Sequence, residues 1–261
     1  MSEAFPAVFV SHGAPTLPLD PIAARDFLSG LGKTLGKPTA ILAVSAHWEN
    51  SEAHVSAAAR PETIHDFYGF PEALYRMSYP APGAPDLAQR VRDLLDKSGI
   101  SAQVHPTRGL DHGAWVPLLL MYPDADIPVT QLSVQPPLGT RHHFALGEAL
   151  RELREDGVLI LASGGATHNL REFGRHGINA PPPLWVTGFQ EWLAQTIESG
   201  NTDDFLHYRE RAPEAARNHP SEEHFLPIYV AAGAGTSGTK GRRIHRSYSF
   251  GTFAMDAYRF D

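Results

Sequence analysis

Five histidines occupy positions in the sequence where an imidazole ring could carry out chemistry. Four stand at the ends of apolar runs or beside glycines, and the fifth precedes an apolar, alanine-rich segment: His12, His47, His112, His168 and His224. A single histidine at a strand end is usually structural, with its ring hydrogen-bonded to a backbone carbonyl. Five in one chain are harder to explain in that way, and neutral imidazole is the commonest metal ligand in proteins. The pattern therefore predicts a mononuclear metal site.

Nitrogen and oxygen are the only ligand atoms available to this metal, because the sequence contains no cysteine. Histidine clusters with a carboxylate suit zinc or iron(II). The sequence has no HExxH motif, which argues against a zinc site carried on one helix. It also lacks a Gly-x-Ser-x-Gly elbow around Ser163, a GxxxxGK[ST] loop, and a dinucleotide fingerprint after the first expected strand. No other chemistry has comparable support.

Short apolar runs, typical of strands buried on both faces, precede three of the histidines. These runs are Ala7–Val10, Ala40–Ser45 and Val158–Leu161. In open α/β sheets, ligands bind in the crevice beyond the carboxyl ends of the strands. We therefore expect the histidines to converge at one edge of a sheet.

Strands and helices alternate along the rest of the chain. Helices are expected at 21–35 (with Asp20 as N-cap), 86–98, 142–155 and 184–199, and strands at 100–104, 129–134 and 248–260, the last with a bulge at Gly251–Thr252. Residues 51–85 form a long irregular segment, either a wall of a pocket or a surface excursion. With no repeat or linker, the sequence predicts one α/β domain over residues 1–261, with a central, mostly parallel or mixed sheet flanked by helices.

Composition limits the partners that this chain can have. The formal net charge of −7 argues against nucleic-acid binding. The chain begins without the features of a signal peptide, and no apolar run approaches the roughly 18 residues of a membrane span. We expect a cytoplasmic protein that binds neither nucleic acid nor membrane and is a monomer or a small homo-oligomer.

With these motifs in hand, the chain closely resembles the extradiol ring-opening dioxygenases of the LigB-like, class III kind, and within them the bacterial 4,5-DOPA dioxygenase subgroup. The resemblance rests on six stretches: Val10-Ser-His12-Gly, Ser45-Ala-His47-Trp-Glu, Gly109-Leu-Asp-His112-Gly-Ala-Trp, Gln131-Leu-Ser-Val, Gly165-Ala-Thr-His168-Asn-Leu and His219-Pro-Ser-Glu-Glu-His224-Phe-Leu-Pro. They follow one another in the expected order from residue 8 to about residue 230, so the resemblance covers nearly the whole chain.

The resemblance implies that His12 and His47 are metal ligands and that His224 is the third. In protocatechuate-type relatives the third ligand is a glutamate, so Glu222 and Glu223, which precede His224, are competing candidates. An all-nitrogen site suits either iron or zinc. The resemblance implies Fe(II) as the metal for activity, and Zn(II) is the alternative bound ion.

The resemblance also implies roles for the remaining two histidines. His168 is the expected acid–base residue and an alternative fourth ligand when no substrate is bound, and His112 orients the substrate hydroxyl or the bound oxygen. Two neighbouring tryptophans, Trp48 and Trp115, either pack in the core or form a wall against the substrate ring. Thr167 and Asn169 are weaker candidates for contact with substrate.

The implied function is the opening of the ring of a small, DOPA-like catechol by O2, which gives a muconic semialdehyde. A zinc-dependent hydrolase that uses the same histidines is the alternative enzymatic hypothesis. A third hypothesis is a protein that binds a metal or a small ligand without turnover.

Overall fold

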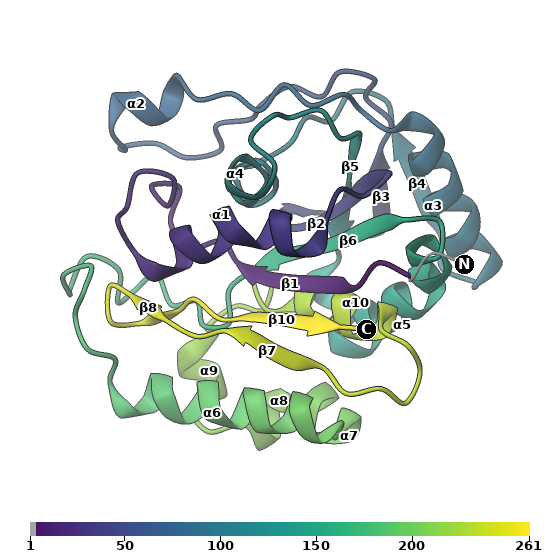
Figure 1. Ribbon diagram of the computed structural model, residues 1–261. Coiled ribbons are helices and arrows are strands. Elements are labelled where there is room, and N and C mark those ends of the chain that lie inside the picture. Colours follow the sequence, from purple (N-terminus) through teal and green to yellow (C-terminus); the bar gives the residue numbers. More distant parts are fainter. Residues whose placement is uncertain (1–3) are drawn as a thin grey trace.

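A mixed sheet of eight strands forms the centre of the computed structural model, which describes residues 4–261 (Figure 1). The strands lie in the order β4 (Ala102–His105), β3 (Ala53–Ser56), β5 (Val129–Val134), β2 (Ala40–Glu49), β6 (Val158–Gly164), β1 (Ala7–Ser11), β10 (Ala257–Phe260) and β7 (Arg242–His245). The four central strands β5, β2, β6 and β1 are parallel, whereas β3, β10 and β7 each pair antiparallel with a neighbour. The expected single α/β domain with a mixed sheet is therefore confirmed.

Helices cover both faces of this sheet because alternate side chains of the buried central strands point in opposite directions. In β1, for example, Val8 and Val10 pack in one core, and Ala7 and Phe9 pack in the other. The first core lies under α1 (Ala23–Leu35) and α4 (His112–Met121), and the second under α3 (Pro85–Lys97), α5 (Gly139–Leu150), α6 (Leu184–Ser199) and α10 (Leu226–Ala234).

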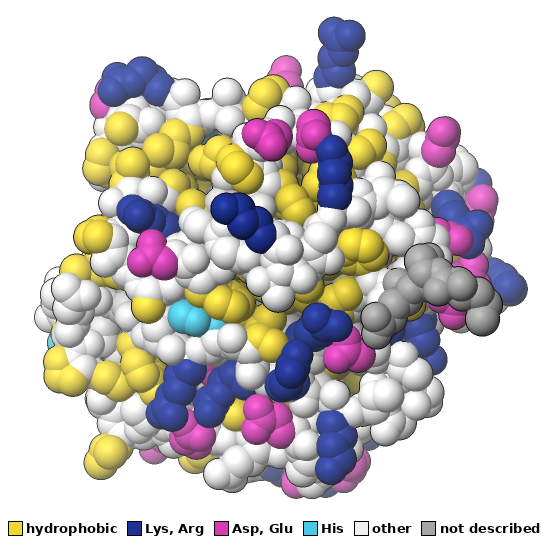
Figure 2. All heavy atoms as spheres, viewed as in Figure 1, with side chains coloured by type: hydrophobic (Ala, Val, Ile, Leu, Met, Phe, Trp, Pro, Cys, Tyr) yellow, Lys and Arg dark blue, Asp and Glu magenta, His cyan; other side chains and the backbone are white. Residues whose placement is uncertain are grey.

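Shorter elements complete the fold. They are α2 (Glu72–Tyr75), α7 (Thr202–Leu206), α8 (Tyr208–Arg211), α9 (Ala215–Asn218), the 3-10 helices Pro136–Leu138 and Arg151–Arg154, and a small hairpin of β8 (Tyr248–Ser249) and β9 (Phe253–Ala254). Among the helices of residues 4–261, none combines the length and the apolar character that crossing a bilayer requires. Acidic and basic side chains are interspersed on the face shown in Figure 2, without a broad patch of one sign.

Two expected boundaries are wrong for local reasons. Helix α1 begins at Ala23 instead of residue 21, and Asp20 does not cap it, because the Asp20 carboxylate accepts a hydrogen bond from Thr16 Oγ1 at 2.7 Å within the preceding turn. The tail is not one bulged strand over 248–260. Phe250 and Gly251 have φ angles of 51° and 69°, and this left-handed backbone makes a hairpin turn at the site of the expected bulge.

Helix α4 was not expected from the sequence, although it carries one of the five histidines. It is buried almost all round and contains Pro117, so it shows no apolar stripe of helical period. Its start is fixed by Asp111, a fully buried N-cap whose carboxylate accepts hydrogen bonds from the backbone N–H of Ala114 at 3.3 Å and from Ser45 Oγ at 2.6 Å.

Helix α5 carries a buried titrating group that is not one of the five histidines. The buried ring of His143 donates from Nδ1 to the Gly139 carbonyl at 2.7 Å, and its Nε2 accepts from the backbone N–H of Gln135 at 3.0 Å. Both nitrogens are satisfied only in the neutral ring, and burial lowers the pKa of His143 from 6.5 to about 4.

We predict a pH-dependent contribution of His143 to stability. Because its folded pKa lies below its unfolded value, the unfolded chain binds more protons between pH 6.5 and 4, so this stabilisation is present above pH 6.5 and is lost as the pH falls toward 4. The shift corresponds to about 3 kcal/mol. Urea unfolding should therefore show that His143→Gln loses less stability than the unsubstituted protein between pH 7 and pH 4.5. An equal loss in both proteins would contradict this assignment.

Candidate metal centre

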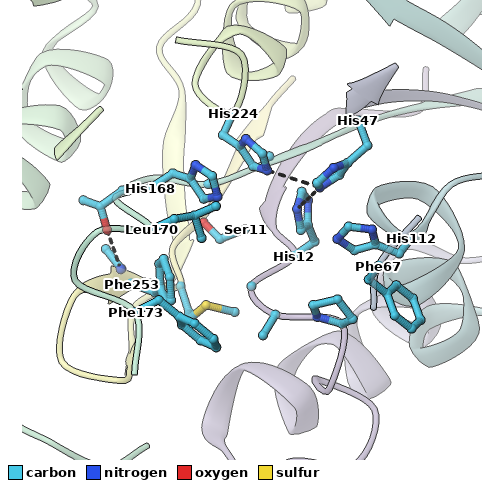
Figure 3. A pocket seen from close by; sticks show the side chains of 18 of the residues that line it. Ser11, His12, His47, Phe67, His112, His168, Leu170, Phe173, His224 and Phe253 are labelled. Carbon is cyan, nitrogen blue, oxygen red and sulfur yellow. Dashed lines mark hydrogen bonds between the residues drawn. The ribbon is translucent and has the colours of Figure 1, made fainter. Parts of the chain in front are cut away.

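Three of the predicted histidines bring one ring nitrogen each to a common point (Figure 3). The Nε2 atom of His47 lies 3.0 Å from Nε2 of His12 and 3.2 Å from Nε2 of His224. These three rings are called the histidine trio below. Two nitrogens bound at about 2.1 Å to one metal ion lie about 3.0 Å apart at a right angle and about 3.4 Å apart at a tetrahedral angle. The separations in the trio therefore fit ligation of a single ion.

The sheet and one close backbone contact bring the trio together. His12 directly follows β1, and His47 lies near the end of β2, two parallel strands that both pair with β6. His224 approaches from the turn before α10, where its carbonyl accepts a hydrogen bond from the N–H of Gly165 at 2.8 Å. A Cβ atom at Gly164 would lie 2.1 Å from the same carbonyl oxygen. Only glycine at position 164 permits this approach.

The second nitrogen of each trio ring faces an oxygen. His12 Nδ1 lies 3.0 Å from Ser163 Oγ, His224 Nδ1 lies 2.9 Å from Glu223 Oε1, and His47 Nδ1 lies 3.6 Å from Asp66 Oδ2. Ser163 donates its own proton to the Gly113 carbonyl, so it accepts from His12. Partners of this kind fix the tautomer of a metal-binding histidine and hold its ring in place.

The trio is neutral, with its lone pairs directed at the common point. Burial, reinforced by the neighbouring imidazoles, holds the pKa of His12 and His224 well below the usual value and lowers the pKa of His47 to about 3. With the protons on Nδ1, the three Nε2 atoms have no hydrogen to share. A cation between them would satisfy all three lone pairs at once, which makes this donor set suitable for a metal ion.

A carboxylate that the sequence did not reveal connects the trio to His112, the first residue of α4. Asp66 Oδ1 accepts hydrogen bonds from both the backbone N–H and the ring Nδ1 of His112, each at 2.9 Å. Although burial alone would raise the pKa of Asp66, these bonds lower it to about 2, so the carboxylate is ionised. Asp66 belongs to the irregular segment 51–85, where no motif or periodicity marks a functional residue.

His168, four residues beyond β6, lies beside the trio without joining it. Its ring stacks on that of His224 with 3.5 Å between centroids and 11° between planes, and its Nδ1 lies 3.7 Å from Glu223 Oε1. Burial lowers the pKa of His168 to about 4, although the charge of Glu223 opposes this shift. The ligand atoms of His168 gather with those of Glu223 and His224, not with the other two trio rings.

The contacts of the other candidate site residues show which of them lie at the site. Glu222 accepts a hydrogen bond from the Tyr208 hydroxyl at 2.7 Å, whereas Glu223 contacts His224. Trp48 and Trp115 are buried in the fold and line no part of the cavity beside the trio. The Asn169 amide donates to the Arg217 carbonyl at 2.7 Å and is also absent from that cavity.

One cavity of about 190 Å³ opens beside all five histidines (Figure 3). Phe67 and Phe70 line one part of it, so this portion of segment 51–85 forms a pocket wall, one of the two alternatives expected for it. The cavity thus combines a neutral nitrogen trio, two further imidazoles and apolar walls, an arrangement suited to a small aromatic ligand.

Comparison with known proteins identifies the family. The model of the family described as "Catalytic LigB subunit of aromatic ring-opening dioxygenase" matches residues 26–260. The chain belongs to the LigB family. It is 43% identical to a 4,5-DOPA dioxygenase extradiol of Beta vulgaris, over 97% of this chain and 95% of that protein, and 40% identical to a 4,5-DOPA dioxygenase extradiol of Escherichia coli K12, over 89% and 86%. The crystal structure of an uncharacterized protein from Escherichia coli K12 superposes with a TM-score of 0.80 at 32% identity, covering 98% of this chain and 100% of that one.

Membership of the LigB family confirms the expected metal-dependent extradiol dioxygenase class, whose members use a small aromatic substrate and O2. LigB dioxygenases use a non-haem metal, and the histidine-rich site of this chain could bind one. The comparisons give no support to a zinc-dependent hydrolase, the alternative that the sequence left open.

We predict that Ser163→Ala weakens metal binding by about 10- to 100-fold, because His12 Nδ1 then loses the hydroxyl that fixes its tautomer. Titration with Zn(II) or Co(II) against a competing chelator measures this change. Ser56→Ala is the matched control, since Ser56 is also buried and its hydroxyl donates to the carbonyl of Arg108 and not to a ring of the trio. Equal metal affinities in the two variants would exclude an orienting role for Ser163.

Proposed function

We propose that this protein uses O2 to open the ring of a small catechol such as DOPA, with one Fe(II) ion held by His12, His47 and His224. The observation that carries the proposal is the convergence of three neutral Nε2 atoms beside a cavity of one-ring size. Relatives named 4,5-DOPA dioxygenase extradiol, 40–44% identical over most of the chain, support the choice of substrate ring. Iron(II) bound there would lower the pKa of the catechol hydroxyls and allow ring electrons to reach dioxygen.

His112 has the chemistry to orient the substrate. Its Nδ1–H is committed to the ionised Asp66, which leaves Nε2 as a hydrogen-bond acceptor. The ring centroid of His112 lies 3.9 Å from that of His47 and 5.5 Å from that of His12, so its free nitrogen is close to the trio. In this role His112 accepts a hydrogen bond from a catechol hydroxyl and fixes the ring in one orientation.

His168 has the chemistry of a proton carrier. The lowered pKa keeps its ring neutral and able to accept a proton from a catechol hydroxyl, while Glu223, 3.7 Å from Nδ1, stabilises the imidazolium that forms. The same ring then returns the proton as the aromatic ring opens. Because its ligand atoms group with Glu223 and not with the whole trio, we assign His168 acid–base chemistry and not a fourth metal bond. Extradiol opening gives a muconic semialdehyde.

Substitutions should distinguish a metal-ligand histidine from the acid–base histidine. His47→Ala should lose both metal binding and activity, whereas His168→Ala should retain stoichiometric Fe(II) but open the catechol ring about 10²- to 10⁴-fold more slowly, because only proton transfer is removed. Metal content, oxygen uptake and the yellow semialdehyde absorbance with DOPA are the measurements.

Two results would count against this proposal. A fully active His168→Ala protein would refute the acid–base role. Failure of the Fe(II)-loaded protein to consume O2 with any catechol would refute the ring-opening function. Zn(II)-loaded protein is the control, and we expect it to bind the catechol without oxygen uptake, since Zn(II) is not redox-active.

A further inference from the structure

The first turn of α4 contacts three of the five histidines. His112 belongs to this turn. The carbonyl of the next residue, Gly113, accepts a hydrogen bond from Ser163, whose Oγ lies 3.0 Å from Nδ1 of His12. A Cβ atom at Gly113 would lie 2.9 Å from Cδ2 of His47, so the backbone of the turn packs directly against that ring. Figure 3 shows His12, His47 and His112 side by side. The position of this turn therefore sets the distance from His112 to the trio.

The side chain of Asp111, the N-cap of α4, anchors the turn to two neighbouring strands. Its Oδ1 accepts hydrogen bonds from Ser45 Oγ of β2 at 2.6 Å and from the N–H of Ala114 at 3.3 Å. Its Oδ2 accepts from Gln131 Nε2 of β5 and from the Arg108 guanidinium at 3.1 Å. All four partners donate, so this fully buried side chain serves only as an acceptor, which is the role of a carboxylate.

Two of these partners lead back to the strand segment that carries His47. Ser45 Oγ accepts a hydrogen bond from the backbone N–H of His47 at 3.2 Å while it donates to Asp111. The Arg108 guanidinium lies 5.3 Å from the ring centroid of Trp48, the residue after His47, in a cation–π contact. Asp111 thus fixes the first turn of α4 relative to the backbone of a proposed metal ligand.

Two carboxylates therefore hold His112 in different ways. Asp66 accepts from the ring Nδ1 and the backbone N–H of His112, which sets the orientation and the tautomer of the ring. Asp111 instead fixes the backbone from which the ring projects, with the ring centroids of His112 and His47 only 3.9 Å apart. A displacement of about 1 Å at a catalytic group can cost a factor of about 100 in rate. Loosening of the turn would therefore affect the reaction as well as the stability.

We infer that Asp111 is a positioning residue of the ring-opening reaction, because it holds His112 where its Nε2 meets a hydroxyl of the bound catechol. The inference rests on the proposed function and adds to it a residue that lines no part of the cavity. It also gives a role to Ser45, Gln131 and Trp48, three residues of the family stretches that do not line the cavity either.

Asp111→Asn tests the anchor with little change in volume. An Asn side chain still caps a helix, but its NH2 group faces donors where Asp111 accepts. Gln131 also accepts from the N–H of Asp111 at 3.4 Å, so it cannot satisfy both groups of the variant. We expect kcat/KM for DOPA, from oxygen uptake by the Fe(II)-loaded protein, to fall about 10- to 100-fold. Co(II) affinity, measured against a chelator, should change less than about threefold, since the trio and its Nδ1 partners are unchanged.

A second substitution should rescue this loss. Adding Gln131→Glu to Asp111→Asn exchanges the donor and the acceptor of the pair at constant net charge, so the contact can form again in reverse. We expect kcat/KM of the double variant to lie within about threefold of that of the unsubstituted protein.

A double-mutant cycle shows whether Asp111 acts through His112. Anaerobic calorimetry with Zn(II)-loaded protein gives the affinity for DOPA without turnover. Asp111→Asn should weaken this affinity at least about fivefold when His112 is present and less than about twofold in the His112→Ala background. Asp256→Asn is the matched control, since Asp256 is also a fully buried carboxylate, which accepts hydrogen bonds from Gln190 and Tyr258. Any effect of Asp256→Asn should be the same in both backgrounds.

The outcomes distinguish the two proposals. If no catechol supports oxygen uptake, the ring-opening function fails, and the cycle of anaerobic affinities decides the positioning role independently. If catechols are cleaved but Asp111→Asn is fully active, or weakens DOPA binding equally with and without His112, the function stands and the inference is overturned. Should Asp111→Asn fail to fold, Arg108→Gln removes only the ion pair with Asp111, from a side chain that is 24% exposed. Its effect on DOPA affinity must then show the same dependence on His112, or the inference is overturned.

Discussion

The convergence of three uncharged imidazoles on one point is the constraint on which the rest of the structure depends. Neutral rings with their Nε2 atoms 3.0 and 3.2 Å apart need burial to keep them unprotonated and a separate partner for each Nδ1. The parallel strands β1, β6 and β2 supply the burial and bring two of the rings to the same edge of the sheet. The third ring arrives only because position 164 has no side chain in the way of the His224 carbonyl.

Two carboxylates outside the trio connect it to the remaining histidines in the same way. Asp66 contacts trio member His47 and hydrogen-bonds to His112, and Glu223 hydrogen-bonds to trio member His224 and faces His168. The donor set at the common point is therefore neutral, while negative charge lies one residue further out. Such charge orients the rings and raises their basicity without occupying a coordination position. It also couples the position of each additional histidine to a member of the trio.

Local sequence features predicted the parts of the site that local chemistry determines. An apolar run that ends before a histidine requires only strand propensity and burial, so His12, His47 and His168 could be placed near one sheet edge. Helix α4 is buried all round and therefore shows no amphipathic period, and the turn at Phe250 and Gly251 looks like a strand bulge. Asp66 was not predicted because its role depends on a contact with His112, 46 residues away, which no local pattern encodes.

The division of the cavity into a histidine end and an apolar end follows from how the hydroxyl groups are used. Ser11 and Thr167 face the cavity, yet their hydrogen bonds hold the backbone of the loop after β6 and of the C-terminal segment in place. Neither hydroxyl can donate to a ligand without losing its bond to a carbonyl, although each oxygen keeps one acceptor lone pair. The imidazole nitrogens of the lining lie together at one end, so they can orient the hydroxyls of a ligand from that end. Phe67, Phe173 and Phe253 add apolar surface to the lining, so the nitrogen ligands and the apolar contacts of the cavity come from separate sets of residues.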